Sequence, residues 1–224
     1  PELDPQFMPL PVFIESFLKT ANEPLAIAIE REDDQIQIFD TRIHGTSEME
    51  TADRLFVERI AKFLLWSRGG FRLTICGNQK IGEFIKAEYA DKGKRDFDFH
   101  FMADVYERPF EVVCVPYADR PKEFQKSVSI GRNLDGCRIG FDAGGSDRKV
   151  SAVIDGVPVF SEETVWNPKI TPDPSYHFEG ILDSFRKAAS HMPRVDAIGV
   201  SSAGIYINNQ TKVASLFLKV GPED

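Results

Sequence analysis

The chain has 224 residues, 42% of them hydrophobic and 11% aromatic, and its 35 acidic and 27 basic side chains give a formal net charge of −8. This length allows one large domain or two small ones, and the composition excludes a disordered or collagen-like protein. The apolar runs are far shorter than the roughly 17 residues that a membrane-spanning helix needs. The acidic balance also argues against a nucleic-acid partner, so we expect neither membrane nor nucleic acid as a partner.

The three cysteines, Cys76, Cys114 and Cys137, are widely spaced, and each lies in or beside an apolar run. We expect buried free thiols in a reducing compartment and therefore a cytoplasmic protein. Residues 1–7, which precede Met8, are polar, contain proline and lack the basic start and apolar centre of a signal peptide. We interpret them as a vector-derived remnant and exclude them from the fold.

Residues 8–130 are predicted to form an N-terminal α/β domain. Its predicted elements, in chain order, are a hairpin of strands Leu25–Glu30 and Gln35–Phe39, a helix over Ala52–Ser67, a strand over Phe71–Cys76, a helix over Lys80–Tyr89 and a strand over Phe110–Val115. The side chains of Trp66, Phe97, Phe99 and Phe101 are expected to face the core.

A polar stretch, Tyr117 to Gly136, precedes a second predicted domain over residues 137–224. The predicted elements are strands Cys137–Asp142, Val150–Ile154 and Val157–Phe160, a helix with its apolar face over Ile181 to Met192, and a strand over Val195–Val200. Asp155-Gly156 between apolar runs is a strong hairpin signal. The pattern β-β-β-α-β therefore predicts three antiparallel neighbours and a crossover helix packed on a sheet.

The first strand of this domain leads into a glycine turn with residue types that suit phosphate. Asp142 ends the strand and could hold a hydrated Mg²⁺, an ion that usually takes only one or two carboxylates. Gly144 and Gly145 allow positive φ angles and a concavity of N–H groups, and Ser146 could donate to a phosphate. Arg148 or Lys149 could neutralise charge. The alternative is a tight β-turn without a ligand.

The order of these features resembles the start of the actin-like ATPase superfamily, which includes sugar kinases, Hsp70-type ATPases and ROK (repressor, open reading frame, kinase) proteins. The resemblance covers about Cys137 to Val220 and is closest to ROK-type sugar kinases, whose first motif is similar to Asp-x-Gly-Gly-Thr-Lys. Here Ser146 replaces the threonine, and two residues precede Lys149. That spacing resembles the Gly-Ser/Thr-x-x-Lys pattern of other branches.

The resemblance implies a ribonuclease H-like subdomain that binds ATP and Mg²⁺ and belongs to an enzyme that transfers phosphate to a sugar hydroxyl, as glucokinase-like enzymes do. Asp142 would then orient Mg²⁺ through water. The turn residues Gly144, Gly145 and Ser146 would line the path of the β- and γ-phosphates, and Lys149 would support their charge. A loop containing Ser201, Ser202 and Gly204 would face the substrate, with a plain exit from a strand as the alternative.

Two expected features of a ROK kinase are missing. No Asn-Asp-Ala-Asn-like segment follows Gly204 to supply a general base, and the zinc-binding motif is absent, while the four histidines show no ligand spacing. We therefore expect an N-terminal fragment that is inactive by itself and assign no catalytic residue. A non-catalytic nucleotide or sugar sensor and a purely structural α/β module remain as alternatives. Which sugar is bound stays open, as does a homo-oligomer.

Overall fold

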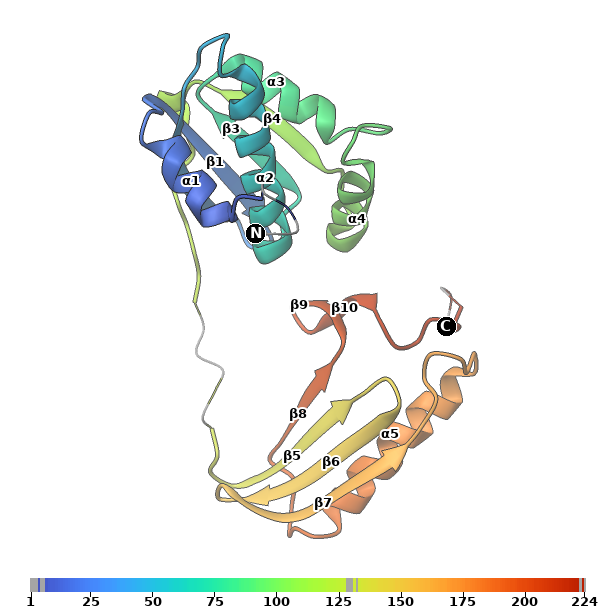
Figure 1. Ribbon diagram of the computed structural model, residues 1–224. Helices are drawn as coiled ribbons and strands as arrows, with labels where there is room; N and C mark the ends of the chain where they lie inside the picture. Colours follow the sequence, from blue (N-terminus) through green and yellow to red (C-terminus); the bar gives the residue numbers. More distant parts are fainter. Residues whose placement is uncertain (1–3, 5–6, 128–130, 132, 222, 224) are drawn as a thin grey trace. The chain divides into compact units, whose positions relative to one another are not determined.

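The computed structural model describes residues 4, 7–127, 131, 133–221 and 223. The chain divides into two compact units, Pro1–Ser127 (unit 1) and Val128–Asp224 (unit 2), and each contains its own sheet (Figure 1). It is thus a mixed α/β protein with several sheets, as predicted. No helix in the described part of the chain is long and apolar enough to cross a bilayer.

Unit 1 is built on a four-stranded sheet of order β2-β1-β3-β4. Strand β1 is antiparallel to both β2 and β3, and β3 is parallel to β4. Its elements are α1 (Leu10–Leu18), β1 (Glu23–Arg31), β2 (Gln35–Ile43), α2 (Glu50–Arg68), β3 (Arg72–Cys76), α3 (Gln79–Glu88), α4 (Asp96–Tyr106), β4 (Glu111–Val115) and the 3₁₀ turn η1 (Tyr117–Asp119).

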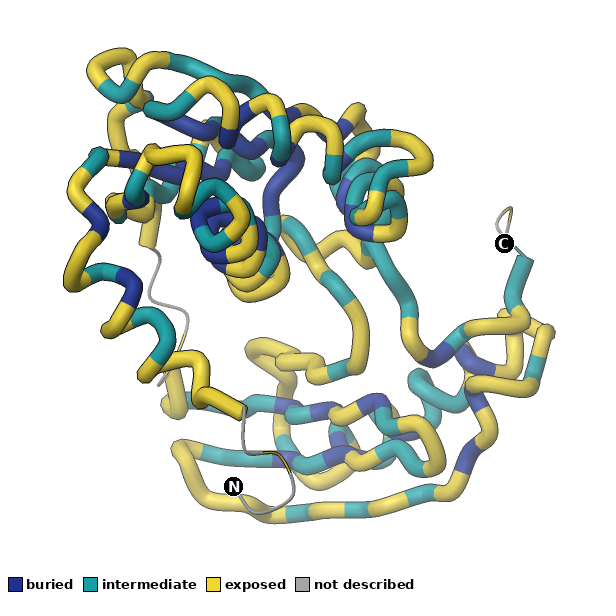
Figure 2. Tube along the Cα trace, turned by 45° about the horizontal axis from the view of Figure 1, so that its top comes forward, coloured by how far each residue is buried: buried dark blue, intermediate teal, exposed yellow. Residues whose placement is uncertain are grey.

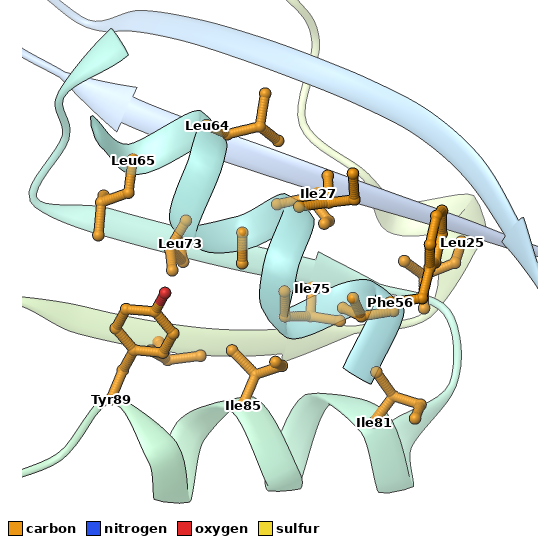
Figure 3. Close-up of a cluster of buried hydrophobic side chains, with 14 of the residues drawn as sticks. Leu25, Ile27, Phe56, Leu64, Leu65, Leu73, Ile75, Ile81, Ile85 and Tyr89 are labelled. Atoms are coloured by element: carbon orange, nitrogen blue, oxygen red, sulfur yellow. The ribbon is translucent and has the colours of Figure 1, made fainter. Parts of the chain in front are cut away.

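The core of unit 1 lies between the sheet and helices α2 and α3. Alternate residues of β1 and β3, such as Leu25, Ile27 and Ile75, meet Phe56 of α2 and Ile85 of α3 (Figure 3). These side chains are at most 2% exposed. The two-residue period of the strands and the helical period of α2 place one apolar face of each element in this core, as the sequence indicated.

Two helices of unit 1 were not predicted, and the placement of two aromatic residues differs from the prediction. Helices α1 and α4 add to the predicted β-β-α-β-α-β order. Trp66 and Phe97, which were expected in the core, are 45% and 66% exposed. The reason is that the indole N–H of Trp66 donates to the Asp98 carboxylate of α4 over 2.5 Å, so its ring lies across two helices at the surface, stacked on Phe101.

Unit 2 contains a sheet of order β7-β6-β5-β8 and a separate two-stranded hairpin, β9-β10. Neighbours β5, β6 and β7 are antiparallel, which confirms the predicted pairing of the first three strands. Strand β8 follows the helix and runs parallel to β5. The elements are β5 (Cys137–Ala143), β6 (Asp147–Ile154), β7 (Val157–Val165), α5 (Pro174–Ala189), β8 (Ala197–Ser202), β9 (Gly204–Ile207) and β10 (Gln210–Ala214).

One face of the unit 2 sheet is covered by α5. Buried residues alternate with more exposed ones along β5, as Figure 2 shows, and Ile139 and Phe141 pack with Ala188 of the helix. The β6-β7 turn has Asp155 and Gly156 at φ angles of 50° and 83°, as the Asp-Gly signal predicts. The residues between these buried positions therefore lie on the opposite face of the sheet.

Candidate functional site

Four polar residues form a row across the sheet of unit 2, on the face opposite α5. Asp142 of β5 pairs with Lys149 of β6 on one side and with Ser201 of β8 on the other, and Lys149 pairs in turn with Glu163 of β7. All four residues are exposed. The fold thus places Ser201, which is distant in sequence, on the strand beside Asp142. Asp142 itself is the last residue but one of β5.

The turn that follows β5 consists of Gly144, Gly145 and Ser146. Neither glycine adopts the positive φ angle that glycine allows. Gly144 is required instead by a close approach, because an added Cβ would lie 2.6 Å from the backbone oxygen of Asp147. Within the described residues, the N–H groups of these three turn residues donate to no protein acceptor. They are therefore available to a ligand.

Trp166 fixes the turn in this conformation. Its indole N–H donates to the carbonyl oxygen of Gly144 over 2.8 Å, and its backbone N–H donates to the carbonyl oxygen of Ser146 over 3.1 Å. The side chain is 1% exposed. Since the C=O and N–H of one trans peptide point in opposite directions, the N–H of Gly145 points away from Trp166. The buried indole therefore orients a donor of the turn.

The cations near the turn differ from those expected. Lys149 forms an ion pair of 3.0 Å with Asp147, and this hydrogen bond raises the pKa of the Lys149 ammonium. The side chain of Arg148 donates to Ser184 of α5 and so lies on the opposite face of the sheet. Lys149 is thus already partly neutralised, and the other predicted cation does not reach the turn.

Lys169 is the cation of the turn that sequence reasoning missed. Its Nζ lies so close to Gly145 that an added Cβ there would be 2.9 Å from it. Among the described residues, no carboxylate lies within 4.0 Å of this ammonium. Lys169 follows β7 and stands 24 positions after Gly145. The prolines at 168, 172 and 174 indicate an irregular link there, but nothing in the sequence relates this link to the glycine turn.

The predicted substrate loop is wrong in its secondary structure. Ser201 and Ser202 belong to β8, where Ser202 pairs with Ala143 and lies on the face that α5 covers. Gly204 begins β9 with a φ angle of 150°, and an added Cβ would lie 2.3 Å from the backbone oxygen of Val213. Continued pairing with β5 keeps both serines in the strand, so Ser201 alone shares a face with Asp142.

The residues present fit a phosphate with an associated divalent cation. Free amide donors and an unpaired ammonium suit an anion. The carboxylate of Asp142 is exposed and, within the described part of the chain, has no hydrogen-bond or ion-pair partner. Such a group suits the outer water shell of Mg²⁺, an ion that keeps several of its waters.

A second cluster of polar groups lies in unit 1. The Nε2 of His100 is 3.1 Å from an oxygen of Asp91 and 3.4 Å from one of Asp96, at the start of α4. The three side chains could hold a metal ion, although the histidines show no ligand spacing in sequence. The contacts are explained equally by ion pairs on an exposed helix end, so we assign no metal site to them.

No family model matches the chain, and no curated protein matches it. Among solved structures, it is similar to an exopolyphosphatase from Cytophaga hutchinsonii, with a TM-score of 0.25 and 9% sequence identity. The match covers 80% of this chain and 64% of the exopolyphosphatase, so the chain spans less than two thirds of that protein. A likeness at this level establishes neither a fold family nor an activity, and these comparisons lend no support to a ROK-type sugar kinase.

Proposed function

We propose that residues 137–224 form an actin-like, ribonuclease H-like ATPase subdomain whose glycine turn binds the polyphosphate of Mg-ATP. The observation that carries the proposal is the unpaired set of donors at the turn. The N–H groups of Gly144, Gly145 and Ser146 and the ammonium of Lys169 have no protein acceptor or carboxylate partner within the described residues. Asp142 stands two residues before them.

The order of the elements also supports this assignment. Three antiparallel strands, a crossover helix and a fourth strand parallel to the first follow the arrangement that the resemblance to the actin-like superfamily requires. In this arrangement β5 is an inner strand, and its end carries both the carboxylate and the turn. Ligands of open α/β sheets commonly bind at strand ends of this kind.

Each residue of the site has a distinct part in this proposal. The N–H of Gly145, held outward by Trp166, donates to a phosphate oxygen, and Lys169 offsets phosphate charge. Asp142 holds the waters of Mg²⁺, which when bound neutralises charge between neighbouring phosphates. Lys149, whose charge is partly offset by its ion pair with Asp147, contributes less to phosphate affinity than Lys169 does.

For the whole protein we propose phosphoryl transfer from ATP to a sugar hydroxyl, the reaction that the resemblance to ROK-type kinases implies. A nucleotide sensor without transfer uses the same turn, and the free donors favour either of these over a purely structural module. Calorimetry separates binding from its absence. We expect Mg-ATP to release or absorb measurable heat with the full chain, and Asp142→Ala to weaken binding more with Mg²⁺ than without it.

The cation assignment is tested with matched variants. Lys169→Ala should weaken binding of inorganic tripolyphosphate by about 5–30-fold, which corresponds to about 1–2 kcal/mol for a charge-assisted contact. Lys149→Ala should have a smaller effect. Arg186→Ala is the control, because Arg186 is exposed in the last turn of α5. The residue of α5 that contacts Trp166 is His177, near the opposite end of the helix. Equal affinities of all three variants for tripolyphosphate would contradict the assignment of Lys169 to the phosphate site. If the unmodified chain gives no heat with Mg-ATP, the purely structural module is the remaining interpretation.

A further inference from the structure

A hydroxyl, an imidazole and a carboxylate lie in a hydrogen-bonded line in unit 1, outside the site described above. Thr20 Oγ1 is 2.8 Å from Nε2 of His44, and Nδ1 of His44 is 3.0 Å from Oδ1 of Asp53. Thr20 follows the end of α1, His44 follows β2, and Asp53 lies in the first turn of α2. Three separate elements therefore converge on this line.

The burial of the three groups is graded. The side chain of Asp53 is 1% exposed and that of His44 is 8% exposed, whereas Thr20 lies at the surface. The ring of Phe17 meets the imidazole edge to face, with 4.6 Å between ring centres. A reagent can reach the hydroxyl, while the imidazole and the carboxylate are held inside the protein.

Hydrogen bonds to Asp53 decide where the proton of His44 lies. The backbone N–H groups of His44 and Gly45 donate to the two carboxylate oxygens over 3.0 and 2.9 Å. An ionised carboxylate only accepts, so a neutral imidazole beside it donates from Nδ1 and has its lone pair on Nε2. That nitrogen then accepts the hydroxyl proton of Thr20, as the base does in a Ser-His-Asp triad.

The residue that follows Thr20 in the chain carries a backbone N–H without a partner in the described residues. Ala21 is 1% exposed, yet its N–H has no acceptor among the parts of the chain that the structure describes. Buried N–H groups are rarely left unpaired. In acyl-transfer enzymes of another fold, the N–H of the residue after the nucleophile supplies part of the oxyanion hole. Ala21 occupies that position relative to Thr20.

We propose that Thr20 is a nucleophile toward carboxylic esters, with His44 as its general base and Asp53 as a positioning residue. The Oγ1–carbon bond forms as the hydroxyl proton passes to Nε2 of His44, and the ester C–O bond breaks as the leaving alkoxide takes that proton. Water then attacks the acyl-threonine through the same base, releases a carboxylic acid and restores the hydroxyl. Esters are favoured because an alkoxide leaves more readily than an amide nitrogen.

The test is reaction of the full chain with a fluorophosphonate probe, followed by peptide mass spectrometry. In this reaction the Oγ1–phosphorus bond forms, the phosphorus–fluorine bond breaks, fluoride leaves and the hydroxyl proton moves to His44. We expect the adduct on Thr20. Thr20→Ser should retain labelling, Thr20→Val should abolish it, and His44→Gln should slow it by about 100-fold or more, the usual contribution of a general base.

Ser67→Ala is the matched control, because Ser67 is an exposed hydroxyl of unit 1 that donates only to a backbone carbonyl. Asp53→Asn should slow labelling and shift the midpoint of its pH–rate profile, which a merely structural role would not do. Melting temperatures of all variants show which remain folded, and the surface variant Thr20→Val is informative even if those of His44 and Asp53 unfold. No adduct, an adduct at another residue, or equal rates in folded His44→Gln would overturn the proposal.

Discussion

The indole of Trp166 is the side chain on which the glycine turn of unit 2 depends, and Trp166→Phe removes its hydrogen bond to Gly144 while keeping an aromatic ring in the core. The lost hydrogen bond leaves a carbonyl without its donor and costs about 1–3 kcal/mol. The smaller ring leaves a void beside His177 and Phe217 that costs about 1–2 kcal/mol more. We therefore expect the free energy of unfolding of unit 2 to fall by about 2–5 kcal/mol.

For a unit of about 100 residues, this loss corresponds to a decrease in melting temperature of about 10–25 °C. The chain contains two tryptophans, one in each unit, which allows the melting transitions to be assigned. In the variant Trp66→Phe, the emission of Trp166 reports on unit 2 alone, and the melting temperature of unit 2 that it gives should equal that of the unmodified protein. Differential scanning calorimetry of Trp166→Phe should then show that transition lowered. A change of less than about 2 °C would refute the role of the indole in holding the turn.

Three further predictions concern stability. Arg95→Ala leaves the carboxylate of Glu58, 3% exposed, without its ion-pair partner and should cost unit 1 about 3–5 kcal/mol, measured by urea unfolding followed through tryptophan emission. Burial raises the pKa of Cys76 to about 11, so between pH 9 and 11 the folded state keeps a proton that the unfolded state loses. The free energy of unfolding should therefore fall as the pH rises from 9 to 11, and it should fall less steeply in Cys76→Ala. Equal pH dependence in the two proteins would contradict this. Gly144→Ala should cost about 1–3 kcal/mol because its Cβ meets backbone, whereas Gly145→Ala meets only a flexible lysine and should cost less than about 1 kcal/mol; calorimetry that ranks them in reverse order would contradict the turn geometry.

The strands of unit 2 could be predicted from sequence because local patterns determine them. Alternation places Ile139 and Phe141 on one face, and Asp155-Gly156 sets the register of a hairpin. The single helix before β8 indicated a crossover packed on the sheet, but the choice of β5 as the partner of β8 is known only from the structure. Each of these signals acts within a few residues or through one short connection.

Helix α4 shows where such local reasoning fails. Phe97, Phe99 and Phe101 alternate as in a strand, yet Phe97 and Phe101 are also four residues apart and so share one face of a helix. That face stacks against Trp66 at the surface, because Asp98, the residue after Phe97, accepts the indole N–H and so joins α4 to α2. The aromatic spacing alone fits both periods, and the deciding hydrogen bond joins residues 32 positions apart.

The candidate site could be predicted in part for the same reason. Asp142 and the glycines are adjacent in sequence, so their proximity was evident, but the donors of the turn acquire their direction from Trp166 and their cation from Lys169. Both come from the segment after β7, which reaches the turn only because β7 is paired along its length with β6. The predicted cation Lys149 lies on β6, where its strand neighbour Asp147 neutralises it. The ion pair with Asp147 thus leaves Lys149 with less positive charge to offer a ligand, whereas Lys169, which has no carboxylate partner among the described residues, offers its full charge.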